Sequence, residues 1–305
     1  MHLASIPYVS LLGFFFGSRL TVSRFSIGQY HPTNFIAFQL LLASLGHVSI
    51  YAISRRRHWP KDWRLSGHAV VAGVVGITLP TTSILSSMQY QSSGITAVSV
   101  SVAPALTMVM AHFFLPDESL NLRRGIGVVL SFSGAAVLVI LGESGFPDVR
   151  TVNPIGYGLV FIAVVSGNAA VIYIRKYMSD YDSFDVASLR MFFAALTFLP
   201  ITGSIVGFDL IQVNRLGFLA LGYASFGYFF EKKLAVYIIQ RFGATAAVMP
   251  AYIASIVATV GGALLLREQI TGGMLTGMAL ILVGIGIIFR NPGVPHGCSL
   301  HAALK

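Results

Sequence analysis

Apolar residues run in ten long segments along the chain, separated by short polar stretches. An apolar segment of about 17–25 residues is long enough to cross a bilayer as a helix. The segments lie at roughly 5–26, 33–54, 66–88, 92–115, 122–141, 154–177, 184–206, 216–238, 243–266 and 271–289. Turn residues such as His31-Pro32 and Asn153-Pro154 stand between them. The pattern predicts an all-α polytopic membrane protein with ten transmembrane helices.

The second half of the chain nearly repeats the first. Single residues recur 150 positions on: Gly17 and Gly167, Glu118 and Glu268, Gly127 and Gly277, and Gly134 and Gly284. Two copies of five spans lie in opposite orientations, because five is odd, and many carriers are built in this way. We therefore expect two inverted repeats, at 1–145 and 146–290, followed by a cytoplasmic tail at 291–305.

Composition supports a membrane protein and narrows its function. The chain is 55% hydrophobic and 10% charged, with a mean hydropathy of +0.77, whereas a soluble chain is about 25% charged. Its net charge of +9 does not indicate nucleic-acid binding, because no basic stripe is interleaved with aromatic residues. Cys298 is the only cysteine, and no CxxC or HExxH motif is present. We expect no metal and no cofactor.

The basic residues predict the orientation of the chain. With the N-terminus inside, twelve of them fall in cytoplasmic loops or the tail: Arg55, Arg56, Arg57, Lys61, Arg64, Arg123, Arg124, Arg175, Lys176, Arg241, Arg290 and Lys305. The outer loops hold only Arg150, Arg215 and Arg267. By the positive-inside rule both termini are cytoplasmic, in a bacterial inner membrane. The run Arg55-Arg56-Arg57 is interpreted as a topology anchor on anionic lipid rather than a nucleic-acid patch.

Small residues and prolines mark places where helices approach or break. Glycines four apart allow close helix packing, either within the bundle or in a homodimer: Gly13 and Gly17, Gly203 and Gly207, and Gly273 and Gly277. Pro80, Pro104 and Pro250 lie well inside predicted spans, and each frees a backbone carbonyl. Interruptions in matching fourth and ninth spans indicate either a substrate site or packed kinks.

Several motifs resemble the EamA repeat of the drug/metabolite transporter superfamily. In the second half they are Arg241-Phe-Gly-Ala-Thr-Ala-Ala, Leu-Leu-Leu-Arg-Glu268, Gly277 and Gly284; in the first, Ser92-Ser-Gly-Ile-Thr-Ala, Pro104, Glu118, Gly127 and Gly134. Phe16-Gly17-Ser18 and Ser166-Gly167-Asn168 resemble the family's Trp-Gly-Ser-Asn, and Arg190-Met-Phe-Phe-Ala-Ala its Arg-Phe-x-x-Ala. The resemblance implies a ten-helix, two-repeat carrier of amino acids, drugs, sugars or related solutes, often an exporter.

The chain departs from that family pattern at four positions. Phe16 replaces the tryptophan, Arg19 follows where a small or amide residue is usual, and Gln39 stands where an arginine is common. The family's proline in the ninth span falls near Ser255, over a turn after Pro250. These departures concern the substrate class rather than the fold.

Charged residues inside spans are candidates for the transport pathway, because each costs about 2.5–3.5 kcal/mol at a helix centre. The candidates are Arg19, Arg190, Glu231, Lys232 and Lys233. Three successive helical residues sweep 200°, so the last three cannot all face one cavity. Glu231 is too deep to reach the surface. It is a proton carrier, half of a fixed ion pair, or a residue of the cytoplasmic vestibule.

The remaining candidates would bind the substrate or serve the structure. Arg19 either grips a carboxylate with its planar fork or pairs internally with Glu231 or a helix end. Arg190 is expected to form an ion pair or to hold the structure. The cavity lining is predicted to include Phe16, Gln39, Asn168, Tyr223, Tyr228 and Tyr252. Glu118 and Glu268 are expected to cap or pair locally.

The function predicted is a secondary transporter for a small amino-acid-like or drug-like solute, working by alternating access and exporting. An alternative is a nucleotide-sugar or drug exchanger, or a membrane sensor or scaffold without transport. No catalytic constellation and no Walker motif are present, so we expect neither an enzyme nor direct use of ATP. The expected partners are a small molecule and the lipid bilayer, with a second copy of the chain in a homodimer as an alternative. We expect no nucleic-acid partner.

Overall fold

The computed structural model describes residues 5–54, 57–115, 120–146, 153–208 and 213–289. Within these ranges the chain forms thirteen α-helices and one π-helical segment, with no strand. The all-helical prediction is confirmed. Some residues used in the sequence analysis lie outside the described ranges: Arg55, Arg56, Glu118, Arg150, Arg290, Cys298 and Lys305.

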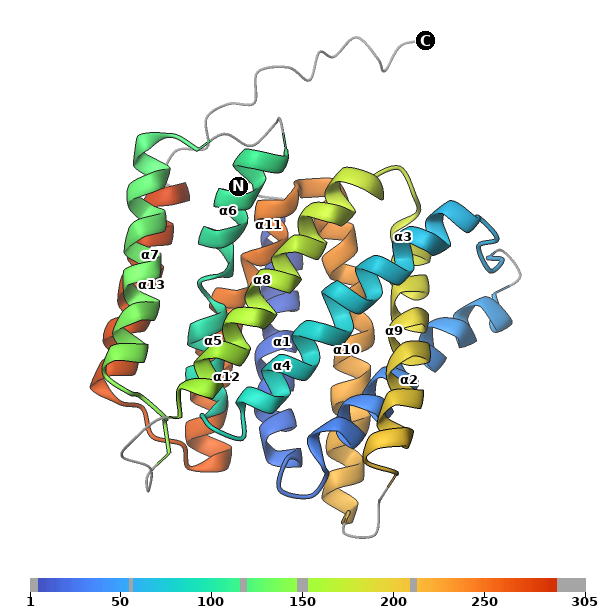
Figure 1. Ribbon diagram of the computed structural model, residues 1–305, viewed down its shortest axis with the longest axis horizontal. Coiled ribbons are helices and arrows are strands. Elements are labelled where there is room, and N and C mark those ends of the chain that lie inside the picture. The colour runs from blue at the N-terminus through green and yellow to red at the C-terminus, as the bar shows by residue number, and fades with distance from the viewer. Residues whose placement is uncertain (1–4, 55–56, 116–119, 147–152, 209–212, 290–305) are drawn as a thin grey trace.

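The two halves of the chain have the same order of helices (Figure 1). The first half consists of α1 (Ile6–Ser26), α2 (Pro32–Ile53), α3 (Trp63–Gly73), η2 (Val74–Thr78), α4 (Leu79–Ser87), α5 (Ser93–Val100), α6 (Ala103–Phe114) and α7 (Leu122–Ile140). The second consists of α8 (Pro154–Tyr177), α9 (Ser183–Ile205), α10 (Arg215–Phe242), α11 (Ala244–Val248), α12 (Pro250–Leu266) and α13 (Gly272–Phe289). In each half the fourth segment is divided in two, as α5–α6 and α11–α12.

Seven helical segments of the described chain are long and apolar enough to cross a membrane: Pro32–Ile53, Trp63–Ser87, Ser93–Phe114, Leu122–Ile140, Pro154–Tyr177, Ser183–Ser204 and Ala244–Leu266. The apolar helix at Gly272–Ile288 is shorter. Helices α1 and α10 are not among the seven, and both carry charged side chains in their interiors, which lower the hydropathy. Length and composition therefore support seven of the ten predicted spans.

Prolines explain where the continuous spans break. Pro80 lies in the first turn of α4, directly after the π-helical segment, and Pro104 and Pro250 lie in the first turns of α6 and α12. A proline cannot donate a backbone hydrogen bond, so the preceding turn loses a partner and the helix restarts. Pro200, by contrast, lies inside α9 without ending it.

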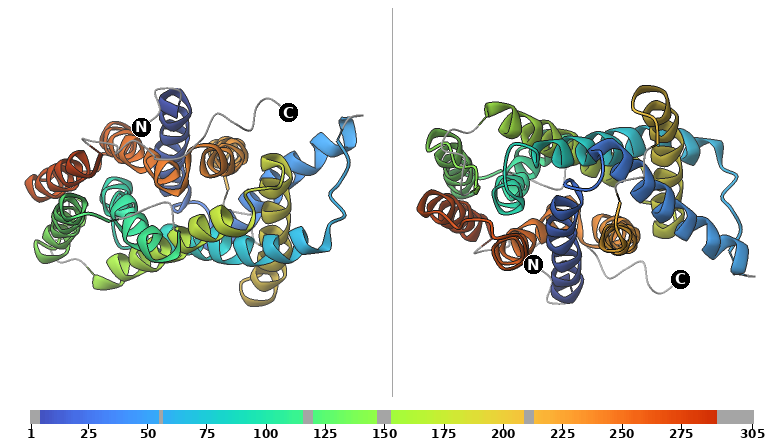
Figure 2. Two further views of the ribbon diagram at one scale, coloured as in Figure 1. Left: turned by 90° about the horizontal axis from the view of Figure 1, so that it is seen from above. Right: turned by 90° about the horizontal axis from the view of Figure 1, so that it is seen from below.

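The glycine pairs bring helices together within the chain. A Cβ atom on Gly17 would collide with the carbonyl of Ala254 in α12, and Gly13 faces Pro250 in the same way. Helices α7 and α13 lie side by side at one edge of the bundle (Figure 2), where Gly134 contacts Gly277. Small residues at these positions allow the backbones to touch.

The loops alternate between two ends of the bundle. At the end where α1 begins and α13 finishes (Figure 1, top), Arg57 Nη1 lies 2.9 Å from Asp182 Oδ1. We call this the basic end. At the opposite end the amide of Ser92 donates to the carbonyl of Ser144 over 2.8 Å, and that of Gln269 to Gly145 over 3.0 Å. Successive membrane segments therefore run in opposite directions between the two ends (Figure 1).

Candidate functional site

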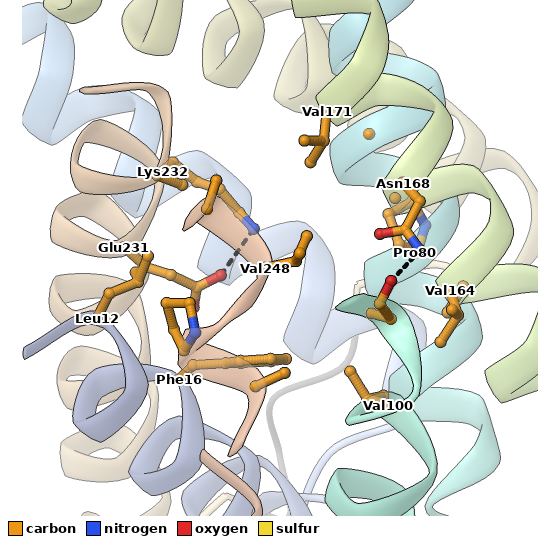
Figure 3. A pocket seen from close by; sticks show the side chains of 18 of the residues that line it. Leu12, Phe16, Pro80, Val100, Val164, Asn168, Val171, Glu231, Lys232 and Val248 are labelled. Atoms are coloured by element: carbon orange, nitrogen blue, oxygen red, sulfur yellow. Dashed lines mark hydrogen bonds and ion pairs between the residues drawn. The ribbon is translucent and has the colours of Figure 1, made fainter. Parts of the chain in front are cut away.

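The central cavity lies between helices of both halves and has a volume of about 170 Å³. Helices α1 and α10 form one wall and α4 and α8 the facing wall (Figure 3). Most of the lining is apolar, with Leu12 and Phe16 on the first wall and Val164 and Val171 on the second. The charged lining residues are Arg19, Arg190, Glu231 and Lys232.

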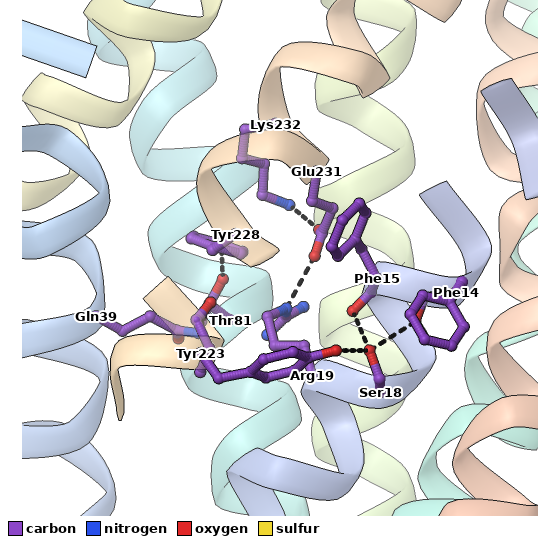
Figure 4. A network of polar contacts seen from close by, with 11 residues as sticks. Phe14, Phe15, Ser18, Arg19, Gln39, Thr81, Tyr223, Tyr228, Glu231 and Lys232 are labelled. Atoms are coloured by element: carbon purple, nitrogen blue, oxygen red, sulfur yellow. Dashed lines mark hydrogen bonds and ion pairs between the residues drawn. The ribbon is translucent and has the colours of Figure 1, made fainter. Parts of the chain in front are cut away.

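Three of these charges form one buried cluster on the first wall (Figure 4). Arg19 Nε donates to Glu231 Oε2 over 2.8 Å, and Lys232 Nζ donates to Glu231 Oε1 over 2.7 Å. The side chains of Arg19, Glu231 and Lys232 are 3%, 7% and 17% exposed. Each carboxylate oxygen therefore has its own cation, which is the arrangement a buried carboxylate needs to remain charged away from water.

Tyr228 supports this cluster from behind. Its ring centroid lies 4.7 Å from Arg19 Cζ and 4.5 Å from Lys232 Nζ, within the range of a cation–π contact. Its hydroxyl lies 2.5 Å from Thr81 Oγ1, which links α10 to α4. The side chain is fully buried and does not line the cavity. Tyr228 therefore positions the charged residues and does not face the cavity itself.

The facing wall carries a single charge, that of Arg190. Its Nε and Nη2 atoms both lie 3.3 Å from the carbonyl oxygen of Ala72, at the end of α3. Arg190 is only 4% exposed, and no carboxylate of the described chain forms a salt bridge with it. Beside it, Asn168 Nδ2 donates to the carbonyl of Ala103 over 3.0 Å, where α6 begins.

Other predicted site residues lie outside the cavity. Gln39 is fully buried and donates to the carbonyl of Ala224 over 3.2 Å. Tyr252 packs into apolar clusters between helices, and Tyr223 donates to Ser18 Oγ over 2.8 Å on an exposed face. Lys233 turns away and lies 5.6 Å from the ring of Phe184.

The sequence analysis missed the small and apolar residues of the second wall. Gly76, Pro80, Thr81 and Ala163 all line the cavity, and the first three belong to the interrupted third span. Pro80 was the available signal, because a proline inside a span marks a distorted helix. The hydroxyl of Thr81 gave no signal, since its partner Tyr228 is 147 residues away.

The lining of the cavity differs between its two ends. Toward the end opposite the basic loops it is bounded by Ile84 and Val100, and beyond them Leu85 and Met88 are fully buried in the main apolar cluster. Toward the basic end, the lining residues Val171, Ala235 and Ala247 are partly exposed, whereas Ile174 and Ile239 are buried.

Glu268 holds the two halves together at the end opposite the basic end. Its carboxylate accepts hydrogen bonds from Ser93 N (2.9 Å), Ser93 Oγ (2.7 Å) and Gly94 N (3.3 Å) at the start of α5. An anion at a helix N-terminus satisfies free amides and complements the helix dipole. Glu268 therefore caps a helix, as expected, but not locally, because these partners are 174–175 residues away.

Histidines do not form a metal site in the described part of the chain, where no group of three or more His, Cys, Asp or Glu residues could hold an ion. His47 Nδ1 lies 3.0 Å from Ser188 Oγ, and His68 Nδ1 lies 2.7 Å from Tyr173 Oη. His112 Nδ1 accepts from the amide of Leu120. Each ring has a separate structural contact.

Comparison with known proteins places the chain among transporters. The model of the EamA-like transporter family matches it twice, at residues 3–140 and 154–290. An "Uncharacterized transporter" of Archaeoglobus fulgidus is 24% identical over 288 residues, covering 91% of this chain and 95% of that protein. The "Uncharacterized transporter YvbV" of Bacillus subtilis is 24% identical over 256 residues, covering 82% and 78%.

A solved crystal structure has the same fold. It covers 92% of this chain and 98% of its own, with a TM-score of 0.64 and a sequence identity of 17%. This likeness concerns the fold alone.

Proposed function

Because this chain belongs to the EamA-like transporter family, we propose that it is a secondary carrier that moves a small metabolite by alternating access. The chain is a membrane transporter. The mechanism and the class of substrate are proposals. One repeat would rock against the other around the cavity, which would open first to one side of the membrane and then to the other.

One observation carries the proposal: the cavity lies between the two halves of the chain. Interrupted helices meet at it, since Pro80, Pro250 and the start of α6 at Ala103 all line the cavity. In carriers built from inverted repeats, broken helices at the repeat interface surround the substrate. Helical ends at such a place present backbone groups that a polar solute can bind.

The volume favours a small solute. Pockets for drug-sized ligands are typically about 300–1,000 Å³, and this cavity is about 170 Å³. We therefore favour an amino-acid-sized metabolite over a drug or a nucleotide sugar. Phe16 would supply apolar contact, and Asn168, though bonded to Ala103, retains a carbonyl oxygen for polar contact.

The Arg19–Glu231–Lys232 cluster is proposed to be a fixed ion cluster rather than a proton-carrying site. Both oxygens of Glu231 already have a cation within 2.8 Å. A carboxylate that must take up and release a proton would have to break these contacts in every cycle. The cluster would instead hold α1 against α10 while the repeats move.

The charge distribution supports a proposed orientation, and the family resemblance supports export as the proposed direction of transport. Both termini are proposed to be cytoplasmic, in a bacterial inner membrane, which puts the basic end inside. The cavity would then face the cytoplasm in this conformation, ready to load a solute for export.

Exchange across proteoliposomes tests the carrier function. Purified protein would be reconstituted with an unlabelled panel of amino acids, organic acids and amines inside, and uptake of each labelled compound measured. Ala235→Phe puts a ring at the partly exposed mouth of the cavity, whereas Ala136→Phe places the same ring on an exposed, lipid-facing position of α7. We expect exchange by the wild type and Ala136→Phe but not Ala235→Phe. Equal exchange in all three proteins would contradict transport through this cavity.

Labelling of introduced cysteines tests the orientation. His31 and His58 flank α2 at its two ends and are both exposed. In a Cys298→Ser background, an impermeant thiol reagent added to intact cells should label His31→Cys and spare His58→Cys. The reverse pattern would overturn the cytoplasmic placement of the termini.

A further inference from the structure

We propose that Arg190 is the binding group for the substrate and that the substrate is a small organic anion, an apolar body bearing a carboxylate or phosphate. This inference rests on the carrier function proposed above and names the class of solute that the same cavity would take.

The charges of the cavity are unbalanced. Its lining contains three cations, Arg19, Arg190 and Lys232, and one carboxylate, that of Glu231. This leaves an excess of two positive charges in a site largely enclosed by apolar side chains. Charges removed from water require compensation, and attraction between opposite charges is much stronger there than in water. An anionic solute would supply the missing charge, whereas an amine would add a third unbalanced one.

The position of the charges selects Arg190 as the binding group. Glu231 lies 2.8 Å from Arg19 and 2.7 Å from Lys232, so both cations of the first wall have a counter-charge, although Arg19 Nη1 is buried without a hydrogen-bond partner in the described chain. Arg190 has no such counter-charge there. Arg190 has five N–H donors, and its two hydrogen bonds within the described chain share one acceptor, the carbonyl of Ala72. A guanidinium with spare donors is suited to an oxyanion, because its planar fork binds carboxylate and phosphate with two parallel bonds.

The surroundings of Arg190 define the rest of the solute. Arg190 lines the cavity and bonds to a backbone carbonyl of α3. On one wall of the same cavity lie Leu12 and Phe16, and on the other Val164 and Val171. These side chains would cover an aliphatic or aromatic body and offer it no hydrogen bonds. The small volume of about 170 Å³ excludes a large apolar portion. The geometry therefore fits one anionic group at Arg190 with a compact apolar body extending toward α1.

A set of solutes with one common body tests the charge preference. Exchange in proteoliposomes would be measured for benzoate, phenyl phosphate, benzyl alcohol and benzylamine, which share a phenyl ring and differ in charge. We expect at least one of the two anions to exchange about tenfold or more faster than the alcohol or the amine. The ratio of benzoate to phenyl phosphate distinguishes a carboxylate site from a phosphate site.

Substitution of Arg190 tests the assignment of the site. Arg190→Lys keeps the charge but loses the planar fork, and we expect the KM for the anion to rise by about tenfold or more. Arg175→Lys is the matched control, because Arg175 Nη1 also donates to a backbone carbonyl, that of Gln240, but lies outside the cavity. We expect its KM to change by less than about twofold.

The outcomes separate the two proposals. If Arg190 served the structure only, Arg190→Lys would lower the melting temperature of the empty protein and leave the preference for anions unchanged, which would overturn the assignment. Faster exchange of benzylamine or benzyl alcohol than of either anion would overturn the anion class and leave the carrier function standing. Failure to exchange these four solutes or any member of the wider panel would contradict the carrier itself.

Discussion

Gln39 and Arg190 occupy matching places in the two repeats and differ in charge. Gln39 lies in α2 and donates to the carbonyl of Ala224 in α10 over 3.2 Å. Arg190 lies in α9 and donates to the carbonyl of Ala72 in α3 over 3.3 Å. In each case the second helix of one half bonds to the third segment of the other half.

The comparison separates the role of the inter-repeat hydrogen bond from the role of the positive charge. A neutral amide makes the inter-repeat hydrogen bond in the first half, so the bond does not require a cation. Only Arg190 lines the cavity, and it is the longer side chain with donors to spare. We therefore propose that a ligand, and not the packing of the repeats, accounts for its positive charge, which is costly inside a membrane.

The largest loss of stability is expected in the Arg19–Glu231–Lys232 cluster. Each charge there contacts an opposite charge, whereas Arg190 contacts none in the described chain. Removing one member of a buried ion cluster costs about 3–5 kcal/mol, because a charge is left without its partner. Glu231→Met should therefore lower the free energy of unfolding in mixed micelles by about that amount. A second change, Arg19→Met, should restore part of it, because it removes the more deeply buried of the two cations that Glu231→Met leaves without a carboxylate, while Lys232 remains.

The same position tests proton coupling. Glu231→Gln mimics a protonated carboxyl group. If Glu231 carried protons, this variant would lose accumulation driven by a pH gradient and keep solute exchange. A fixed cluster predicts lower stability instead, with both transport modes reduced in parallel. Loss of accumulation alone in a well-folded Glu231→Gln protein would contradict our account of the cluster.

An intermediate effect is expected at Gln39. Gln39→Leu removes the hydrogen bond to Ala224, whose carbonyl lies inside α10 and keeps its intrahelical bond, so we expect a loss of about 0.5–1.5 kcal/mol. Since Gln39 lies outside the cavity, the ratio of anion to neutral solute in the exchange assay should not change. If Gln39→Leu changed that ratio more than the substitution of Arg190 does, the assignment of the anion preference to Arg190 and not to Gln39 would be wrong.

The smallest effect is expected for an ion pair at the surface. Asp182 begins α9 and accepts hydrogen bonds from Arg57 and from the amides of Phe184 and Asp185. Burial raises the pKa of Asp182, but these hydrogen bonds outweigh it, so the pKa lies below its ordinary value of 3.8. Its contribution is present at neutral pH and is lost as the pH falls through that lowered value.

Asp182→Asn measures this contribution. The amide still caps the helix but cannot pair with Arg57. Both side chains of the pair are partly exposed, at 48% and 41%, so we expect a loss of less than about 1 kcal/mol at pH 7. The difference from the wild type should shrink at high salt and vanish in acid. A difference that persisted in acid would show that the cap, not the charge, is responsible.

The sequence was sufficient to predict the helical segments and their repetition. The segments are set by apolar runs, and their breaks by Pro104 and Pro250, which act locally through the missing backbone donor. The recurrence of Gly127 as Gly277 likewise follows from close packing, since neither tolerates a Cβ atom. Such features depend on neighbouring residues and can be recognised without knowledge of the fold.

The partners of the charged residues could not be selected in the same way: the sequence offered the pairing of Arg19 with Glu231 only as one alternative and gave no distant partner for Glu268. Arg19 and Glu231 are 212 residues apart, and Glu268 and Ser93 are 175 apart. Nothing in one local pattern identifies the other. Gln39, Tyr228 and Tyr252 were expected to line the cavity because they are polar or amphipathic. The rotation of each helix about its axis decides which residues face the cavity, and the sequence does not specify it. The hydrogen bond of Tyr228 to Thr81 holds the tyrosine side chain between helices instead.

The most direct test removes one cation from each wall and compares the results. Arg190→Gln and Lys232→Met each reduce the excess positive charge of the cavity by one. If the total charge alone attracted the anion, exchange of labelled benzoate or phenyl phosphate would fall equally in both. Our account predicts a loss of about tenfold or more in Arg190→Gln and a clearly smaller loss in Lys232→Met, because Glu231 retains Arg19. Equal losses, or a larger loss in Lys232→Met, would contradict it.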